Sequence, residues 1–234
     1  MRSARSVFVW SVGTALLGSS IGVFAGTAAA PDISGTWIVS ADSPPPADGP
    51  PLKERYASAY KALRKAQAGA SGKGGAGASA QCRIEGMPSV MAGRGALEIL
   101  QTPGQVAVLA EYMTQTRRIY LDGPMPALED ISPGYMGYSG GKWQGNTLEV
   151  QTVGIREDVM FRDIPHSAKM KILEKIHLTA PDVLQDEVTL IDPDYFTGPY
   201  RLTFNYKKDS GHRIAEYVCD HKGMAKDEGK AKSK

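Results

Sequence analysis

Short segments in which apolar and polar side chains alternate every two residues follow one another after residue 95. This period is typical of β-strands that bury one face, and turn-forming residues separate the segments. None of the connections carries a helical crossover of the size that parallel strands need, so antiparallel pairing is expected. The sequence therefore predicts an all-β fold. The expected strands span residues 34–40, 96–102, 105–112, 115–122, 142–144, 147–154, 169–179, 183–192, 199–208 and 213–219.

Closure of these strands into a barrel is the most economical arrangement. A meander of about eight to ten antiparallel strands closes into an up-and-down barrel and thereby leaves no exposed edge strand. Pro103-Gly104 and Gly145-Asn146 each lie between two alternating segments and predict tight hairpin turns. An open sandwich is the main alternative.

The first residues have the plan of a secretory signal peptide. Arg2 and Arg5 precede an apolar run at residues 7–24, and small residues follow up to Ala30. We expect residues 1–29 to be removed by cleavage near Ala28 or Ala29, which places the mature protein in the periplasm or outside the cell. Polar and glycine residues interrupt the apolar run, so a retained membrane span is the less favoured alternative.

An irregular insertion follows the first strand. Residues 43–51 contain five prolines, residues 52–67 carry apolar side chains at helical spacing, and residues 68–80 form a Gly/Ala-rich linker. We therefore expect one domain at residues 30–221, in which 43–80 is an arm with a short helix and a flexible linker. Residues 222–234 are expected to form a disordered, Lys-rich tail.

Charge and cysteine content narrow the function classes. Lys and Arg total 27 against 25 Asp and Glu, a formal net charge of +2, which does not provide the basic surface that nucleic-acid binding needs. Cys82 and Cys219 are the two cysteines of the chain, and in an oxidising compartment we expect them to form one disulfide. The sequence leaves the oligomeric state open.

Two strands carry ionisable residues that could face the interior. Glu174 alternates with Ile172 and Ile176 and so belongs to an apolar row, which points either to a functional carboxylate or to a buried structural pair with an arginine. Arg118, Tyr120 and Asp122 share one face of another strand. That face could orient a polar substrate inside the barrel, or it could lie outside, because the opposite face is also partly apolar.

His166 lies in a loop close to Asp163, and Pro165 restrains the backbone between them. A histidine whose ring is held by an acid is a candidate for proton transfer, and a ring bonded to a backbone carbonyl is the structural alternative. No phosphate loop, dinucleotide-binding glycine motif or metal-binding histidine pair is present in the sequence, so no cofactor and no metal are expected.

Several short motifs together resemble a family of uncharacterised exported proteins of Proteobacteria and Acidobacteria. The resemblance covers roughly residues 32–221 and implies a lipocalin-like, calycin-type barrel, often in bacteria that degrade aromatic compounds. It implies no particular reaction. The motifs are Gln81-Cys82, Gly86-Met87-Pro88, residues 98–104, residues 117–120 with Asp122-Gly123, residues 137–139 with 143–145, Pro165-His166-Ser167 and residues 216–219.

The leading functional hypothesis is a cofactor-independent acid/base enzyme, a lyase, dehydratase or isomerase, acting on a small aromatic molecule such as a lignin-derived compound. His166 would transfer the proton with Glu174 or Asp163 as its complement, while Arg118 and Tyr120 would stabilise negative charge. The alternatives are a periplasmic carrier of a small hydrophobic or aromatic molecule without catalysis, and an envelope interaction module that uses residues 43–80. The expected substrate contacts are Tyr112, Tyr138, Trp143, Glu111 and Asp122.

Overall fold

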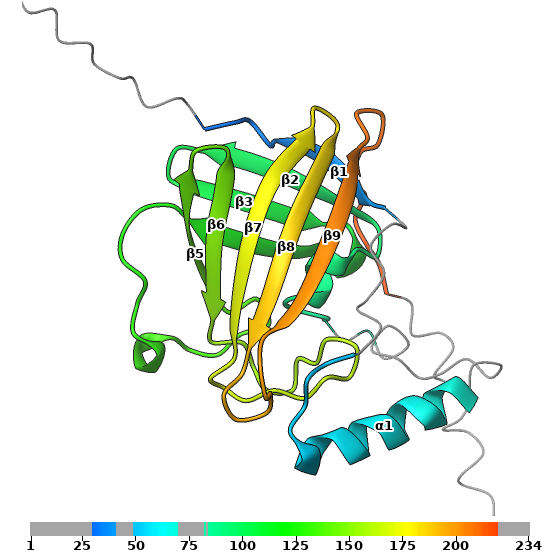
Figure 1. Ribbon diagram of the computed structural model, residues 1–234. Coiled ribbons are helices and arrows are strands. Elements are labelled where there is room, and N and C mark those ends of the chain that lie inside the picture. The colour runs from blue at the N-terminus through cyan, green and yellow to red at the C-terminus, as the bar shows by residue number, and fades with distance from the viewer. Residues whose placement is uncertain (1–29, 41–48, 70–81, 83, 220–234) are drawn as a thin grey trace, which may run out of the picture.

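The computed structural model describes residues 30–40, 49–69, 82 and 84–219. The predicted signal peptide, most of the proline-rich arm and linker, and the Lys-rich tail lie outside these residues. Nine strands form a closed barrel, as the alternation predicts (Figure 1). The strands are β1 (Gly35–Val39), β2 (Ala96–Thr102), β3 (Gln105–Ala110), β4 (Gln115–Tyr120), β5 (Tyr138–Gln144), β6 (Thr147–Val153), β7 (Lys171–Ala180), β8 (Val183–Ile191) and β9 (Tyr200–Lys208).

The strands follow one another around the barrel in chain order, and β9 pairs with β1 to close it. Each neighbouring pair is antiparallel except β4 and β5, which are parallel. Their pairing is short, with only Ile119 opposite Ser139 and Tyr120 opposite Gly140 in register. The purely antiparallel prediction is therefore wrong at this seam. Residues 121–137 form a connection long enough to return the chain to the same end of the barrel, as parallel pairing requires.

The last predicted strand, at residues 213–219, is not formed. Because β1 already pairs with both β2 and β9, no free barrel edge is left for this segment. Side-chain oxygens of the segment after β3 bind it instead: the backbone N–H of Ala215 donates to Glu111 Oε1 at 3.0 Å, and that of Tyr217 donates to Thr114 Oγ1 at 3.1 Å.

Apolar side chains from all parts of the barrel fill its interior. Trp37 on β1 is fully buried, and its Nε1 donates to the carbonyl of Ile33 at 3.0 Å. The 3-10 helix η2 (Ser89–Ala92) adds Val90 and Met91 to this core, and the Tyr206 hydroxyl donates to the Met91 carbonyl at 2.8 Å. These bonds satisfy the polar atoms that the large aromatic side chains bring into the interior.

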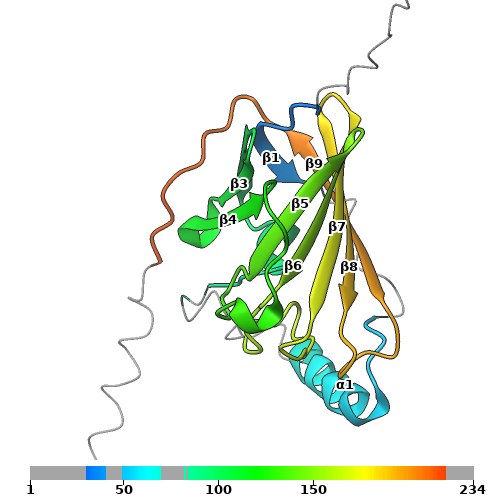
Figure 2. The same ribbon diagram turned by 90° about the vertical axis from the view of Figure 1, so that its left-hand side faces the viewer.

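Helix α1 (Glu54–Gly69) confirms the helix expected at residues 52–67. It lies beyond one end of the barrel, on the side of β8 and β9 (Figures 1 and 2). The start of the helix is fixed to the β8–β9 loop, since Leu52, just before the helix, pairs with Phe196, and the Tyr56 ring in its first turn stacks on Tyr195 at 4.0 Å between centroids. Within the described residues, no helix has the length and apolar character needed to cross a membrane.

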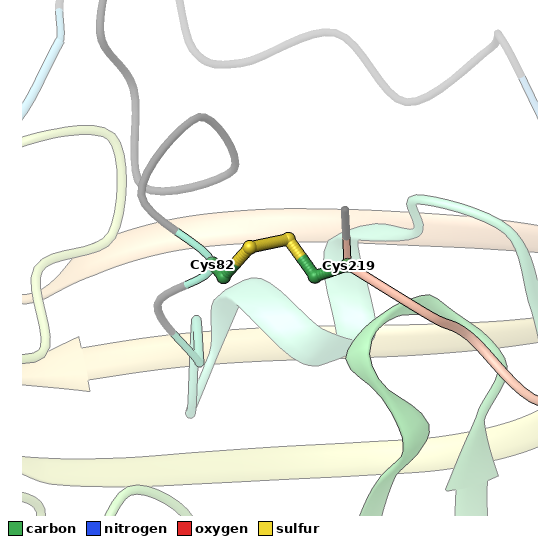
Figure 3. The surroundings of a disulfide bond; sticks show 2 residues. All are labelled: Cys82 and Cys219. Atoms are coloured by element: carbon green, nitrogen blue, oxygen red, sulfur yellow. A yellow bond between two sulfur atoms is a disulfide. The ribbon is translucent and has the colours of Figure 1, made fainter. Parts of the chain in front are cut away.

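Cys82 and Cys219 form the predicted disulfide, with 5.8 Å between their Cα atoms (Figure 3). The bond joins the segment before η2 to the C-terminal segment that lies beside Glu111. A disulfide is typical of proteins in oxidising compartments outside the cytoplasm. The sequence separation of 137 residues corresponds to a stabilisation of about 5 kcal/mol in the chain-entropy model.

Candidate functional site

The alternation along β4 decides which of its charged residues enter the barrel. Arg117 is fully buried beside Ile119, whereas Arg118 and Tyr120 are exposed. The row of Arg118, Tyr120 and Asp122 therefore lies on the outer side, which is one of the two orientations that the sequence leaves open. The interior cation of this strand is Arg117, which sequence reasoning did not single out.

Glu174 on β7 faces the interior, as its place in an apolar row predicts, and it pairs with Arg117. Arg117 Nη1 donates to Glu174 Oε1 at 2.8 Å, and Nη2 donates to Oε2 at 2.5 Å. Both side chains are completely buried. Glu174 therefore forms the buried structural pair with an arginine that the sequence offered as one of its two interpretations. The two parallel hydrogen bonds fix the orientation of both groups.

Two hydroxyl groups complete the contacts of the Arg117 guanidinium. Nε and Nη2 each lie 3.3 Å from Ser139 Oγ on β5, and Nη2 also donates to Thr152 Oγ1 on β6 at 3.1 Å. The two hydroxyls lie 2.7 Å apart and bond each other. One guanidinium consequently links four neighbouring strands, β4 to β7, inside the barrel.

Asp186 on β8 is the third ionisable group of this interior cluster. It is fully buried, and neither of its carboxyl oxygens has a hydrogen-bond partner among the described residues. Burial, and after it the nearby negative charge of Glu174, raises the pKa of Asp186 well above the ordinary value, although Arg117 opposes the change. The cluster holds one cation and two carboxyl groups, so a protonated Asp186 leaves it neutral.

The interior beside Asp186 contains little empty space. A cavity of about 10 Å³ lies between Asp186, Tyr206 and apolar side chains that include Trp37 and Met91. That volume corresponds to about one water molecule, whereas a cavity that binds benzene measures roughly 150 Å³. This cavity therefore does not provide the space that an aromatic molecule would need without rearrangement of the side chains around it.

His166 is buried, and backbone carbonyl oxygens contact both of its ring nitrogens. Nε2 lies 2.7 Å from the carbonyl of Val159, and Nδ1 lies 3.0 Å from that of Ser167. The structure does not bring Asp163 to this ring. Arg162 and Asp163 both have left-handed backbone angles, with φ of 52° and 62°, and the turn directs the Asp163 carboxylate to Gln67 and Arg64 near the end of α1.

The other predicted contact residues are spread over the barrel and form no common pocket. Tyr120 and Tyr138 stack on the outer side at 5.2 Å between ring centroids, and Trp143 packs against the core. Tyr112 contacts the ring of Tyr217, edge to face. Glu111 accepts bonds from the backbone N–H of Ala215 and Ala96, and these bonds hold the pKa of its carboxyl below the ordinary value.

The larger hollow lies on the outer face of β5 to β9 and has a volume of about 830 Å³. We call it the outer groove. Its apolar surface comes from Leu121 and Met125, in the connection after β4, and from Leu173 on β7, which is 37% exposed. Gln151, Thr189 and Arg201 supply polar groups on neighbouring strands. Sequence reasoning missed this site because each of these side chains resembles an ordinary solvated residue of a sheet.

Ligands for a metal ion do not gather at either place. Within the part of the chain that the structure describes, no three His, Cys, Asp or Glu side chains meet in an arrangement that could hold a metal ion. The cluster of Arg117, Glu174 and Asp186 brings a cation next to its two carboxyl groups, and the outer groove presents isolated carboxylates.

Replacement of Arg117 by Met should lower the free energy of unfolding by about 3 to 5 kcal/mol, because Glu174 would remain buried without its partner. The double variant Arg117→Met, Glu174→Leu should recover much of this loss, since no unpaired charge remains. Urea denaturation followed by circular dichroism measures both effects. A double variant no more stable than the single one would contradict the assigned pair.

Replacement of Asp186 by Asn should flatten the dependence of stability on pH. Because the pKa of Asp186 is raised in the folded barrel, the unfolded chain releases the Asp186 proton at a lower pH than the folded barrel does. The contribution of protonated Asp186 to the free energy of unfolding is therefore complete in acid and decreases as the pH rises. Between about pH 4 and about pH 8, wild type should lose more unfolding free energy than Asp186→Asn does. Each tenfold difference in proton affinity corresponds to about 1.4 kcal/mol.

Asp122→Asn is the matched control for this experiment, because Asp122 is exposed on the outer side of the barrel. Its denaturation curves should follow those of wild type across the same pH range. Equal pH dependence in wild type and Asp186→Asn would show that Asp186 is ionised in both the folded and the unfolded chain.

No model of a protein family matches this sequence, and no curated protein matches it. The functional interpretation therefore depends on the geometry of the interior cluster and of the outer groove.

Proposed function

We propose that this is an exported protein that binds a small hydrophobic or aromatic molecule in the outer groove, in the periplasm or outside the cell, without converting it. The observation that carries the proposal is the difference between the two hollows: about 830 Å³ on the outer face against about 10 Å³ inside the barrel. Sites for small ligands usually measure about 300 to 1,000 Å³.

The composition of the groove supports a ligand with an apolar body. Leu121, Met125 and Leu173 offer an apolar surface, and Gln151 and Thr189 offer hydrogen-bonding groups close to it. Most of these residues belong to strands of a closed barrel, so their relative positions are fixed before a ligand arrives. A preformed site of this kind loses little conformational entropy on binding.

The placement of the predicted catalytic groups favours binding over catalysis. Both ring nitrogens of His166 contact backbone carbonyls, which leaves neither nitrogen directed at the groove. Arg118 is exposed on the outer side, while Glu174 is enclosed and bonded to Arg117. Proton transfer requires an acid or base within hydrogen-bond reach of the substrate, and the polar contacts of both His166 and Glu174 are made inside the fold.

Replacement of Leu173 by Arg should abolish ligand retention, since it removes apolar surface at the centre of the groove and adds a charge there. We expect at least about a tenfold loss of affinity, because burying one leucine side chain contributes about 1.5 to 3 kcal/mol. Equilibrium dialysis against a panel of small aromatic compounds, read by mass spectrometry, provides the measurement.

The matched control is Leu100→Arg, because Leu100 is also an exposed leucine on an outer strand face, at 46% exposure on β2, and lies away from the groove. This variant should retain the same compounds as wild type. Retention that survives in Leu173→Arg, or retention that both variants lose alike, would refute binding in the outer groove.

Acid/base catalysis on a small aromatic molecule, by a lyase, dehydratase or isomerase reaction, is a second candidate function. The observation in its favour is Asp186, an enclosed carboxyl group without a hydrogen-bond partner, with a raised pKa and with Glu174 and Arg117 close by. A carboxyl group with a raised pKa, placed beside a second carboxyl group, suits proton transfer. The barrel would have to open for a substrate to reach them.

Product analysis tests this second candidate. Wild type, Asp186→Asn and His166→Ala would each be incubated with the same aromatic panel without added cofactor, with a boiled sample as control. A catalytic Asp186 predicts turnover that falls by about two to four orders of magnitude in Asp186→Asn. Unchanged compounds in every sample would reject catalysis on this panel, and turnover lost only in His166→Ala would transfer the role from Asp186 to His166.

A further inference from the structure

A continuous row of outward side chains crosses the floor of the outer groove. The strand register aligns Gly140 on β5 with Gln151 on β6, then Leu173 on β7, Thr189 on β8 and Arg201 on β9. Neighbouring strands lie about 4.8 Å apart, so Leu173 and Arg201 are separated by about 10 Å and the whole row spans about 19 Å. The groove is therefore much longer than a single aromatic ring.

The two ends of this row differ in chemistry. At the β5 end, Gly140 has no side chain, and the Met125 sulfur occupies that place, 2.8 Å from where a Cβ atom would lie. Leu121 extends this apolar end, and Leu173 adds an apolar side chain at the middle of the row, beyond Gln151. At the β9 end lies the exposed guanidinium of Arg201.

A second row of outward side chains, next to the first, carries charges that compensate one another, whereas Arg201 is left as an unpaired cation within the described part of the chain. Lys142, Glu149, Lys175 and Glu187 lie opposite one another on successive strands, and Lys142 pairs with Glu149 at 3.8 Å. This alternation of sign is self-compensating. Arg201 instead faces Thr189 in register and has no ion-pair or hydrogen-bond partner among the described residues. Lysine and arginine outnumber exposed carboxylates by one along the groove lining.

We infer that the outer groove selects an elongated amphipathic anion whose carboxylate binds Arg201 and whose apolar body lies over Leu173 toward Met125. This inference rests on the proposed binding function and names the ligand class for that site. A guanidinium offers a carboxylate two parallel hydrogen bonds, and the apolar side chains cover a chain of about 10 to 19 Å. Because Arg201 is exposed, its contribution decreases as the salt concentration rises.

Isothermal titration calorimetry with three probes of equal chain length tests the inference: decanoate, decanol and decyltrimethylammonium, each below its aggregation concentration. Wild type should bind decanoate best. Arg201→Gln should weaken decanoate binding by about tenfold, since a hydrogen bond to a charged group contributes enough free energy for such a change, and should leave decanol binding unchanged. Butyrate, which is too short to reach from Arg201 to the apolar end, should bind more weakly than decanoate.

Arg213→Gln is the matched control, because Arg213 is an exposed arginine outside the groove, and its decanoate affinity should equal that of wild type. Equal binding of the three probes, or an Arg201→Gln variant that binds decanoate like wild type, would overturn the anionic selectivity while leaving groove binding intact. If Leu173→Arg also fails to reduce the binding of decanol, the neutral probe on which the added charge exerts no attraction, the proposed function itself is refuted. The two failures are therefore distinguishable.

Discussion

The ion pair between Arg117 and Glu174 holds the barrel together where its backbone pairing is weakest. β4 and β5 share only two residue pairs in register, and the Arg117 side chain crosses this seam to reach Ser139, Thr152 and Glu174 on the next three strands. A buried pair gains little net free energy, because desolvation offsets its attraction. Its consequence is specificity: a shift of β4 by one residue would turn Arg117 outward and leave Glu174 buried without a partner.

The same alternation that fills the interior also builds the outer groove. On β7, Glu174 faces the ion-pair cluster, while its neighbours Leu173 and Lys175 face the groove. On β8, the buried Asp186 lies between two groove residues, Gln185 and Glu187. One strand register thus determines both which side chains face the interior and which face outward. The Arg117–Glu174 pair, which fixes this register, therefore also fixes which side chains face a ligand in the outer groove.

Local patterns predicted much of this fold, and long-range pairing explains what they missed. Short sequence segments predicted the strands, the turn pairs and the helix, and the expected oxidising compartment predicted the disulfide. The structure confirms these features. The parallel seam depends on where residues 121–137 return the chain, which no local pattern encodes. Arg117 was missed because both faces of β4 carry an arginine. Asp186 was missed because a strand acid is usually solvated, and its burial becomes visible only beside Glu174.

A ligand that entered the barrel would have to compete with these interior contacts. Separating Arg117 from Glu174 costs about 3 to 5 kcal/mol, which lowers affinity by roughly two to four orders of magnitude before any contact with the ligand forms. The outer groove requires no such separation, because its side chains face open space. Among the described residues that line it, the exposed ion pair is that of Lys142 with Glu149. For a small amphipathic molecule, the outer face is therefore the less costly place to bind, even though barrels of this size often hold a ligand inside.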